Sequence, residues 1–331
     1  MTTFKEIRGT TIEVLSSDPS NPETGQIWYN SSSGTLKGYL LANVNAWASG
    51  GNTPDSVYGR TGFGTQTAAI GAGGGDPITA NAISYNGTAW TATTSMPSGQ
   101  QLAGGSGTQT AGLIFGGGTP APTGTRTMTF NGSSWTTVNS MNSPHAVGGW
   151  AGLTQTAALS FGQSPSPTSA SEIWNGTSWT ATPSLNTGRL LNAGFGSASS
   201  AISAGGQTTP APKLSAVESW NGTSWTNTTS LPSTLAYMSG RGSSNTSGLV
   251  FGGAAGPGES AETSQTSLWN GTAWTASGSM ARGTGRIYMA SAGNSTDSAL
   301  AFNGAPIAVP GSSLTEEWTG QALLTRTITV S

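Results

Sequence analysis

Short apolar runs alternate along this chain with clusters of Gly, Ser, Thr and Asn. One stretch shows the pattern well: small residues at Leu102–Thr108, an apolar run ending in Gly-Gly at Ala111–Gly117, alternation at Arg126–Phe130 and a Trp within Ser134–Val138. No window places apolar residues at the i, i+3, i+4, i+7 spacing of a helix. The pattern therefore predicts four short strands, called A to D below, with the small residues of strand A beside a crowded centre.

This unit recurs along the chain. The hexamer NGTSWT stands at Asn175–Thr180 and Asn221–Thr226, and near-copies begin at Asn86, Asn131 and Asn270. A period in the forties is typical of propeller blades. The Asn-Gly pair between strands C and D predicts a type I′ hairpin turn, and we expect the Trp to pack between neighbouring blades. The Trp residues that define the period are Trp90, Trp135, Trp179, Trp225 and Trp274.

The same period extends to both ends of the chain. Downstream, Ser298–Phe302, Thr315–Trp318 and Leu323–Val330 predict a sixth unit whose turn is Thr319-Gly320. Upstream, Trp47 is in register with Trp90, and the segments that fall near strands A, B and C are Thr11–Leu15, Gln26–Asn30 and Lys37–Leu41. We therefore favour seven blades, with residues 1–50 as a degenerate first blade. In the alternative, residues 1–50 are an N-terminal attachment segment and residues 51–331 form six blades.

The repeats resemble a known family. Gly-Gly pairs close strand B at Gly73, Gly116, Gly205 and Gly252, and a Trp follows about twenty residues later. This pattern resembles the Kelch repeat over roughly residues 55–331, with departures at Gly162-Gln163 and Asn303-Gly304. The resemblance implies an all-β, Kelch-like β-propeller.

A second resemblance concerns the N-terminal stretch. DPSNPETGQIWYNSSSGTLKGYL, at Asp18–Leu40, resembles a segment of structural proteins of marine tailed phages. That resemblance implies a virion-associated protein, and no residue-level site is carried over from it.

Composition excludes several classes of function. Twelve Trp in 331 residues argue against a disordered chain, although only 7% of the residues are charged. A net charge of −2 gives no basic surface for nucleic acid. No apolar run is long enough for membrane insertion, and the N-terminus has no apolar region of a signal peptide. The chain has no Cys, so disulfides and thiolate metal sites are excluded.

The repeats agree on one face of the expected propeller and differ on the other. The A–B turns read GTQTA at Gly64–Ala68 and Gly107–Ala111 and LTQTA at Leu153–Ala157, and the C–D turns are the Asn-Gly units. The B–C and D–A loops are diverse, and function tends to reside on such loops, with Tyr and Arg as favoured anchors. Ordinary solvated loops are the alternative interpretation. The candidate binding residues are Tyr58, Arg60, His145, Arg189, Tyr237, Arg241, Arg286 and Tyr288.

Residues for catalysis are missing from the pattern. His145 is the single histidine and has no nucleophile motif nearby, so a Ser-His-Asp triad is not expected. The copper chemistry known on Kelch propellers needs a Cys-linked Tyr and several His. Glu172, Glu218 and Glu316 share one repeated position on strand C, which we interpret as a polar contact between blades rather than a glycosidase pair. We predict no cofactor, no metal site and no enzymatic activity.

The expected function is binding. We expect a phage virion protein, either a tail-associated adhesin or a decoration protein. Its N-terminal segment would contact other virion proteins, and its variable-loop face would bind a host-surface glycan or protein. The alternative is a cellular or secreted lectin-like or protein-interaction propeller. A glycan-active enzyme on the same scaffold is the third hypothesis, disfavoured by the missing side chains.

Overall fold

The computed structural model describes residues 12–75, 77–118, 124–163, 168–208, 212–257, 259–281, 285–305 and 311–328. Regular structure in these residues consists of strands. A search of the same residues for a helix able to span a membrane finds none. The chain forms two compact units, one of Met1–Val44 with Gly320–Ser331 and the other of Asn45–Thr319.

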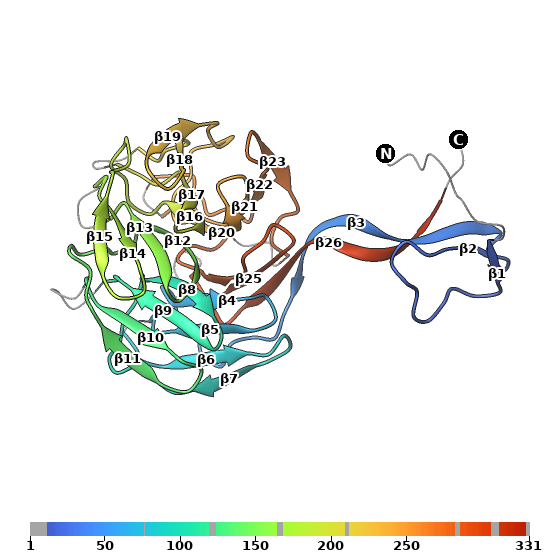
Figure 1. The fold of residues 1–331 in the computed structure, drawn as a ribbon, viewed down its shortest axis with the longest axis horizontal. Coiled ribbons are helices and arrows are strands. Elements are labelled where there is room, and N and C mark those ends of the chain that lie inside the picture. Colours follow the sequence, from blue (N-terminus) through green and yellow to red (C-terminus); the bar gives the residue numbers. More distant parts are fainter. Residues whose placement is uncertain are drawn as a thin grey trace. The chain divides into compact units, whose positions relative to one another are not determined.

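The larger unit is a propeller of six four-stranded blades, in which strand A lies nearest the centre (Figure 1). The A strands are β4 (Thr61–Gly64), β8 (Gly104–Thr108), β12 (Gly149–Thr154), β16 (Ala193–Ser197), β20 (Ser239–Ser244) and β24 (Ala290–Ala292). The B strands are β5 (Ala69–Ala72), β9 (Ala111–Phe115), β13 (Ala157–Phe161), β17 (Ser200–Ala204), β21 (Ser247–Phe251) and β25 (Ser298–Phe302).

Strands C and D complete each blade toward the rim (Figure 1). The C strands are β6 (Ala82–Tyr85), β10 (Thr127–Phe130), β14 (Ser171–Trp174), β18 (Val217–Trp220), β22 (Thr266–Trp269) and β26 (Thr315–Thr327). The D strands are β7 (Trp90–Thr93), β11 (Trp135–Val138), β15 (Trp179–Thr182), β19 (Trp225–Thr228), β23 (Trp274–Ser277) and β3 (Thr35–Ser49). The four strands predicted from the second repeat are therefore confirmed, with bounds that move by a few residues.

Close contact between the A strands explains their small residues. A Cβ added at Gly105 would lie 2.6 Å from the carbonyl oxygen of Gly62 in the preceding blade. A Cβ at Gly194 would lie 2.4 Å from the carbonyl oxygen of Trp150. Larger side chains at these positions would push the blades apart around the centre.

The sixth blade takes its strands from both ends of the propeller unit. Its strands A and B are β24 and β25, its strand C is the first part of β26, and its strand D is the last part of β3. The Gly50 N–H donates to the Thr315 carbonyl at 2.9 Å, and the rings of Trp47 and Trp318 lie 5.5 Å apart. The same aromatic pairing joins strands C and D in the other blades, as between Trp174 and Trp179.

Two predictions about blade count are therefore wrong. Trp47 keeps the register of the repeat because it belongs to strand D of the last blade, not to a seventh blade. The structure has six blades, and residues 1–50 are not a degenerate first blade. The turn predicted at Thr319-Gly320 is also wrong, because β26 runs without interruption to Thr327.

The repeated Trp of strand D packs between blades. Its ring contacts a Phe of the preceding blade at centroid distances of 4.5 to 6.3 Å. The indole N–H of Trp47, Trp90 and Trp179 also donates to a Thr hydroxyl on strand C of that blade, at 2.8 to 2.9 Å. The ring pairs are Trp90–Phe302, Trp135–Phe63, Trp179–Phe115, Trp225–Phe161, Trp274–Phe195 and Trp47–Phe251.

The C–D turns differ from the predicted type I′ geometry. Phe130 pairs with Trp135, so four residues form the loop, and Gly132 has a positive φ of 93° while Asn131 does not. Asn131 acts instead through its side chain, whose Oδ1 accepts hydrogen bonds from the backbone N–H of Ser133 and Ser134. The same arrangement recurs in the other NG hexamers, so Asn is repeated there as a side-chain acceptor rather than for a left-handed backbone.

The repeated Gln of the A–B turns joins neighbouring blades. Gln155 Nε2 donates to the carbonyl oxygens of Gly112 and Phe130 in the preceding blade, at 2.9 and 2.8 Å. Gln66 and Gln109 make equivalent contacts with the blades before theirs. The uniform face of the propeller is thus built from contacts between blades.

The smaller unit contains β1 (Glu13–Leu15), β2 (Ile27–Asn30), the first part of β3 and the last part of β26. The Asp18 carboxylate accepts hydrogen bonds from Trp28, Asn30 and Lys37 at 2.7 to 3.0 Å. All the large apolar side chains that are exposed in the described residues belong to this unit, namely Ile12, Val14, Tyr29, Leu41, Val44 and Leu324.

Closure of the ring by strand β3 can be tested with Trp47→Ala. We expect a loss of about 3–5 kcal/mol in the free energy of unfolding, because a buried aromatic ring and its contacts with two blades disappear. Chemical denaturation followed by Trp fluorescence measures the change. Val44→Ala, at an exposed position on the same strand, is the control and should change stability by less than about 0.5 kcal/mol. Equal effects of the two substitutions would contradict this account of closure.

Candidate functional site

Each D–A loop ends with a residue of left-handed backbone two positions before strand A. The φ angles of these residues lie between 48° and 64°. Five of the six are not Gly, and such a conformation is costly for a residue with a side chain, above all for the β-branched Val147. The six residues are Gly59, Leu102, Val147, Leu191, Tyr237 and Tyr288.

Backbone hydrogen bonds link these positions from blade to blade. The Leu102 N–H donates to Gly59 O at 2.7 Å, the Leu191 N–H donates to Val147 O at 2.6 Å, and the Tyr237 N–H donates to Leu191 O at 2.9 Å. Equivalent bonds run from Val147 to Leu102 and from Gly59 to Tyr288. The chain of bonds around the channel holds the strained backbone in place, and it positions the five side chains of this set at the mouth of the channel.

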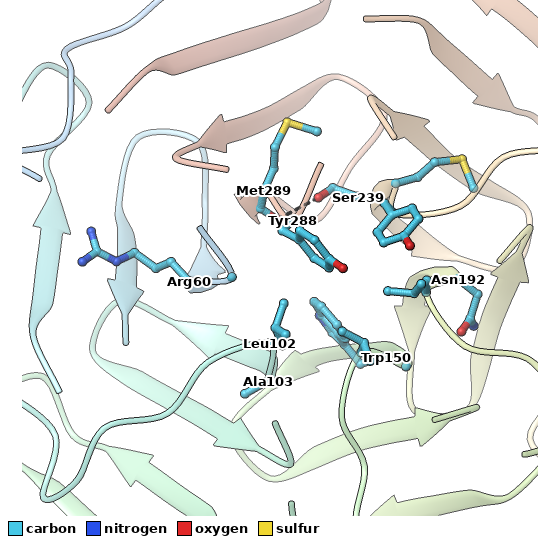
Figure 2. A pocket seen from close by; sticks show the side chains of 14 residues that line it. Arg60, Leu102, Ala103, Trp150, Asn192, Ser239, Tyr288 and Met289 are labelled. Atoms are coloured by element: carbon cyan, nitrogen blue, oxygen red, sulfur yellow. Dashed lines mark hydrogen bonds between the residues drawn. The ribbon is translucent and has the colours of Figure 1, made fainter. Parts of the chain in front are cut away.

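These side chains surround a small cavity, shown in Figure 2. Its volume is about 60 Å³. The side chains of Trp150 and Tyr288 approach one another across the opening, whereas Arg60 points away from it (Figure 2). Sites for whole small molecules usually enclose 300 Å³ or more, so this cavity suits one small group of a larger ligand.

Three of the candidate tyrosines meet at one side of the mouth. The rings of Tyr237 and Tyr288 lie 5.1 Å apart at 88°, and those of Tyr58 and Tyr288 lie 6.1 Å apart. The Tyr288 hydroxyl donates to Glu259 Oε1 at 2.9 Å. Burial, followed by the nearby Glu259 carboxylate, raises the pKa of both Tyr237 and Tyr288, so both phenols are neutral hydrogen-bond donors.

Lys213 adds a positive charge to this cluster. Its Nζ lies 5.4 Å from the centre of the Tyr237 ring, a cation–π distance. The side chain is buried, and Nζ has no hydrogen-bond partner in the described residues. Burial lowers the pKa of Lys213, which the Glu259 carboxylate partly offsets. The cluster therefore combines aromatic rings with one enclosed donor that has no hydrogen-bond partner among the described residues.

Four other candidate residues bond within the protein. Arg60 forms a bidentate ion pair with Asp55 at 2.7 Å. The remaining three pair with the repeated Glu of strand C, which accepts from the incoming D–A loop of its own blade. These pairs are His145 with Glu172 at 3.3 Å, Arg189 with Glu218 at 2.6 Å and Arg286 with Glu316.

The repeated Glu therefore anchors the D–A loop rather than bridging two blades as expected. Glu218 shows the arrangement: its carboxylate accepts from the backbone N–H of Asn186 and Thr187 as well as from Arg189. Glu172 does the same with Asn142 and Ser143. Both carboxylates are buried, and their oxygens are occupied by these bonds.

Arg241, the eighth candidate, lies on strand β20 in the channel wall and not on a loop. Large parts of the variable B–C loops, including residues 119–123, 164–167 and 209–211, lie outside the described residues. Sequence analysis did not select Lys213, Glu259 or Trp150 for the site. Alignment of the repeats on strand A would have pointed to Leu102, Val147 and Leu191, because they occupy the same position as Tyr237 and Tyr288.

Comparisons with known proteins bear on the fold. No family model matches the chain, and no curated protein matches it. Among solved structures 312 chains match. One of them, titled "Structure of YjhT", is 15% identical, covers 80% of this chain and 95% of its own length, and has a TM-score of 0.63. At this identity the likeness shows the β-propeller fold alone, and one such fold carries many functions. The Kelch and phage resemblances gain no support from the comparisons.

The Glu172 anchor predicts a pH-dependent stability. Burial raises the pKa of Glu172, but the neighbouring His145 and hydrogen bonds from Ser143 and Asn142 outweigh it and leave the pKa at about 2, against an ordinary value of 4.5. A depressed folded-state pKa stabilises the protein above pH 4.5, and the stabilisation is lost as the pH falls toward 2. Glu172→Gln should cost about 2 kcal/mol at pH 7 and much less near pH 3, as measured by urea unfolding.

The control for this experiment is Glu23→Gln, at an exposed position of the smaller unit. It should leave stability unchanged at both pH values. A Glu172→Gln penalty that is the same at pH 7 and pH 3 would show that the ionised carboxylate is not what anchors the loop.

Proposed function

We propose that this chain is a non-enzymatic binding protein that holds a surface glycan at the channel mouth on its D–A loop face. The observation that carries the proposal is the cluster of Tyr58, Tyr237 and Tyr288 beside the unpaired ammonium of Lys213. Aromatic faces stack on the apolar faces of sugar rings, and phenol, ammonium and carboxylate groups hydrogen-bond sugar hydroxyls. The small cavity would take a single substituent while the rest of the glycan lies on the loops.

The carboxylates argue for binding rather than hydrolysis. Glycoside hydrolysis needs two carboxyl groups facing one sugar bond. The residues that line the cavity include none, and Glu259 is the carboxylate bonded to the tyrosine cluster in the described part of the chain. Glu172 and Glu218 are buried in their loop anchors and face no open site.

We further propose that the protein is exposed on a phage virion, as a tail-associated adhesin or decoration protein. The resemblance of Asp18–Leu40 to phage structural proteins motivates this step. The exposed apolar side chains of the smaller unit favour it, since a unit of this size with such a surface is suited to contact another virion protein. The glycan at the channel mouth would then belong to the host surface.

Glycan binding is tested with a glycan array probed with the full-length purified chain. Tyr288→Ala and Lys213→Met should weaken binding to any glycan found at least about tenfold, while thermal stability changes little. Tyr29→Ala, which removes an exposed tyrosine of the smaller unit, should leave binding unchanged. Unaltered binding by both mouth variants would refute this site. Cleavage of the bound glycan would show that the protein is an enzyme rather than a binding protein.

The virion assignment is tested by mass spectrometry of phage particles purified from a culture that produces the protein. We expect the chain to co-purify with intact particles and to be absent from particle-free supernatant after ultracentrifugation. A chain found only with cells or in the supernatant would favour the alternative, a cellular or secreted lectin-like propeller. That result would not affect the proposal of a glycan site.

A further inference from the structure

Arg241 projects from strand β20 in the wall of the central channel. The side chain is more than nine-tenths buried, with 8% of its surface exposed. Its Nε donates to Ser291 Oγ at 2.9 Å, and its Nη2 donates to the carbonyl oxygens of Gly62, at 3.0 Å, and Ser291. Because Ser291 belongs to β24 and Gly62 to β4, one guanidinium links the fifth, sixth and first blades.

The charge of Arg241 has no counter-charge among the described residues. Its acceptors are one hydroxyl and two backbone carbonyls, and no described carboxylate bonds to it. Burial lowers its pKa to about 10, which still leaves the guanidinium charged at neutral pH. No acceptor for Nη1 is found among the described residues. An unpaired buried cation is costly, so an anion beside it would be favoured.

Arg241 lines space that could hold such an anion. Two cavities of about 10 Å³ each adjoin Arg241. Arg241 is the one ionisable residue among those that line them, and the Asn294 side chain offers a further N–H donor in the first cavity. This volume suits one particle about the size of a water molecule.

We infer that the central channel binds a single monatomic anion of the size of chloride, held by the Nη1 group of Arg241. Water fits the same space but leaves the positive charge uncompensated. The anion would complete the contact that joins three blades at the centre of the ring. The inference is independent of the proposed glycan site, because Arg241 lies in the channel wall and not in the tyrosine cluster.

An anion that binds the folded protein and not the unfolded chain raises the unfolding temperature. We expect the full-length chain to unfold about 2 °C higher in sodium chloride than in sodium gluconate of equal ionic strength. Arg241→Met should abolish this chloride-specific shift. Arg126→Met should preserve it, because Arg126 bonds the Gly99 carbonyl away from the channel cavities. Wild-type protein without a chloride-specific shift, or Arg241→Met protein with one, would overturn the inference.

A second measurement covers the case in which Arg241→Met does not fold. Crystals of the wild-type chain grown in sodium bromide should show an anomalous peak within hydrogen-bonding distance of Arg241 Nη1. The inference fails if the channel contains no anomalous peak at saturating bromide, whatever the unfolding experiments give.

Discussion

Closure of the ring is the constraint on which the rest of this structure depends. Six blades meet around one channel only if the last blade finds an outer strand, and that strand comes from the N-terminal side of the chain. Trp47 then packs against Phe251 and Trp318 and donates to Thr266, just as the Trp of each other blade packs against its neighbour. Every blade is thereby supported on both sides, and the sixth blade has the same four strands as the others.

Closure of the ring also explains why the repeats agree on one face of the propeller and differ on the other. The A–B turns repeat because their Gln joins neighbouring blades. The NG hexamers repeat because their Asn closes the C–D turn and their Trp packs against the preceding blade. The opposite face is supported from beneath, where the buried carboxylates of Glu172 and Glu218 hold the backbone of their D–A loops. Most of the charged side chains described on this face form such bonds within the protein. The described residues that line the mouth are mostly apolar or aromatic, and Lys213 lies beside the tyrosines.

The four strands of a blade could be predicted from the sequence. The blade that each strand joins and the partner of each side chain could not. Strand D of the last blade looks like any other in sequence, so the register of Trp47 could not show which blade it completes. Arg189 and Arg286 were selected as binding anchors, yet they are buried against Glu218 and Glu316, about thirty residues away. A signal was present within the chain: repeats with a cationic or titratable loop residue carry Glu on strand C, whereas those with Gln100 and Leu235 carry Met128 and Ser267.

At the mouth of the channel, the fold determines where a residue lies, and the type of side chain determines what it can bind. Gly59, Val147 and Tyr288 share nothing in side-chain chemistry, yet all adopt the same left-handed backbone. Local preference would not place Val147 there, so the hydrogen bonds to neighbouring blades must outweigh its intrinsic cost. A residue at this position is therefore presented to the channel whatever its type. The propeller determines where the six residues lie, and their identities, together with neighbours such as Lys213, determine what the mouth can bind.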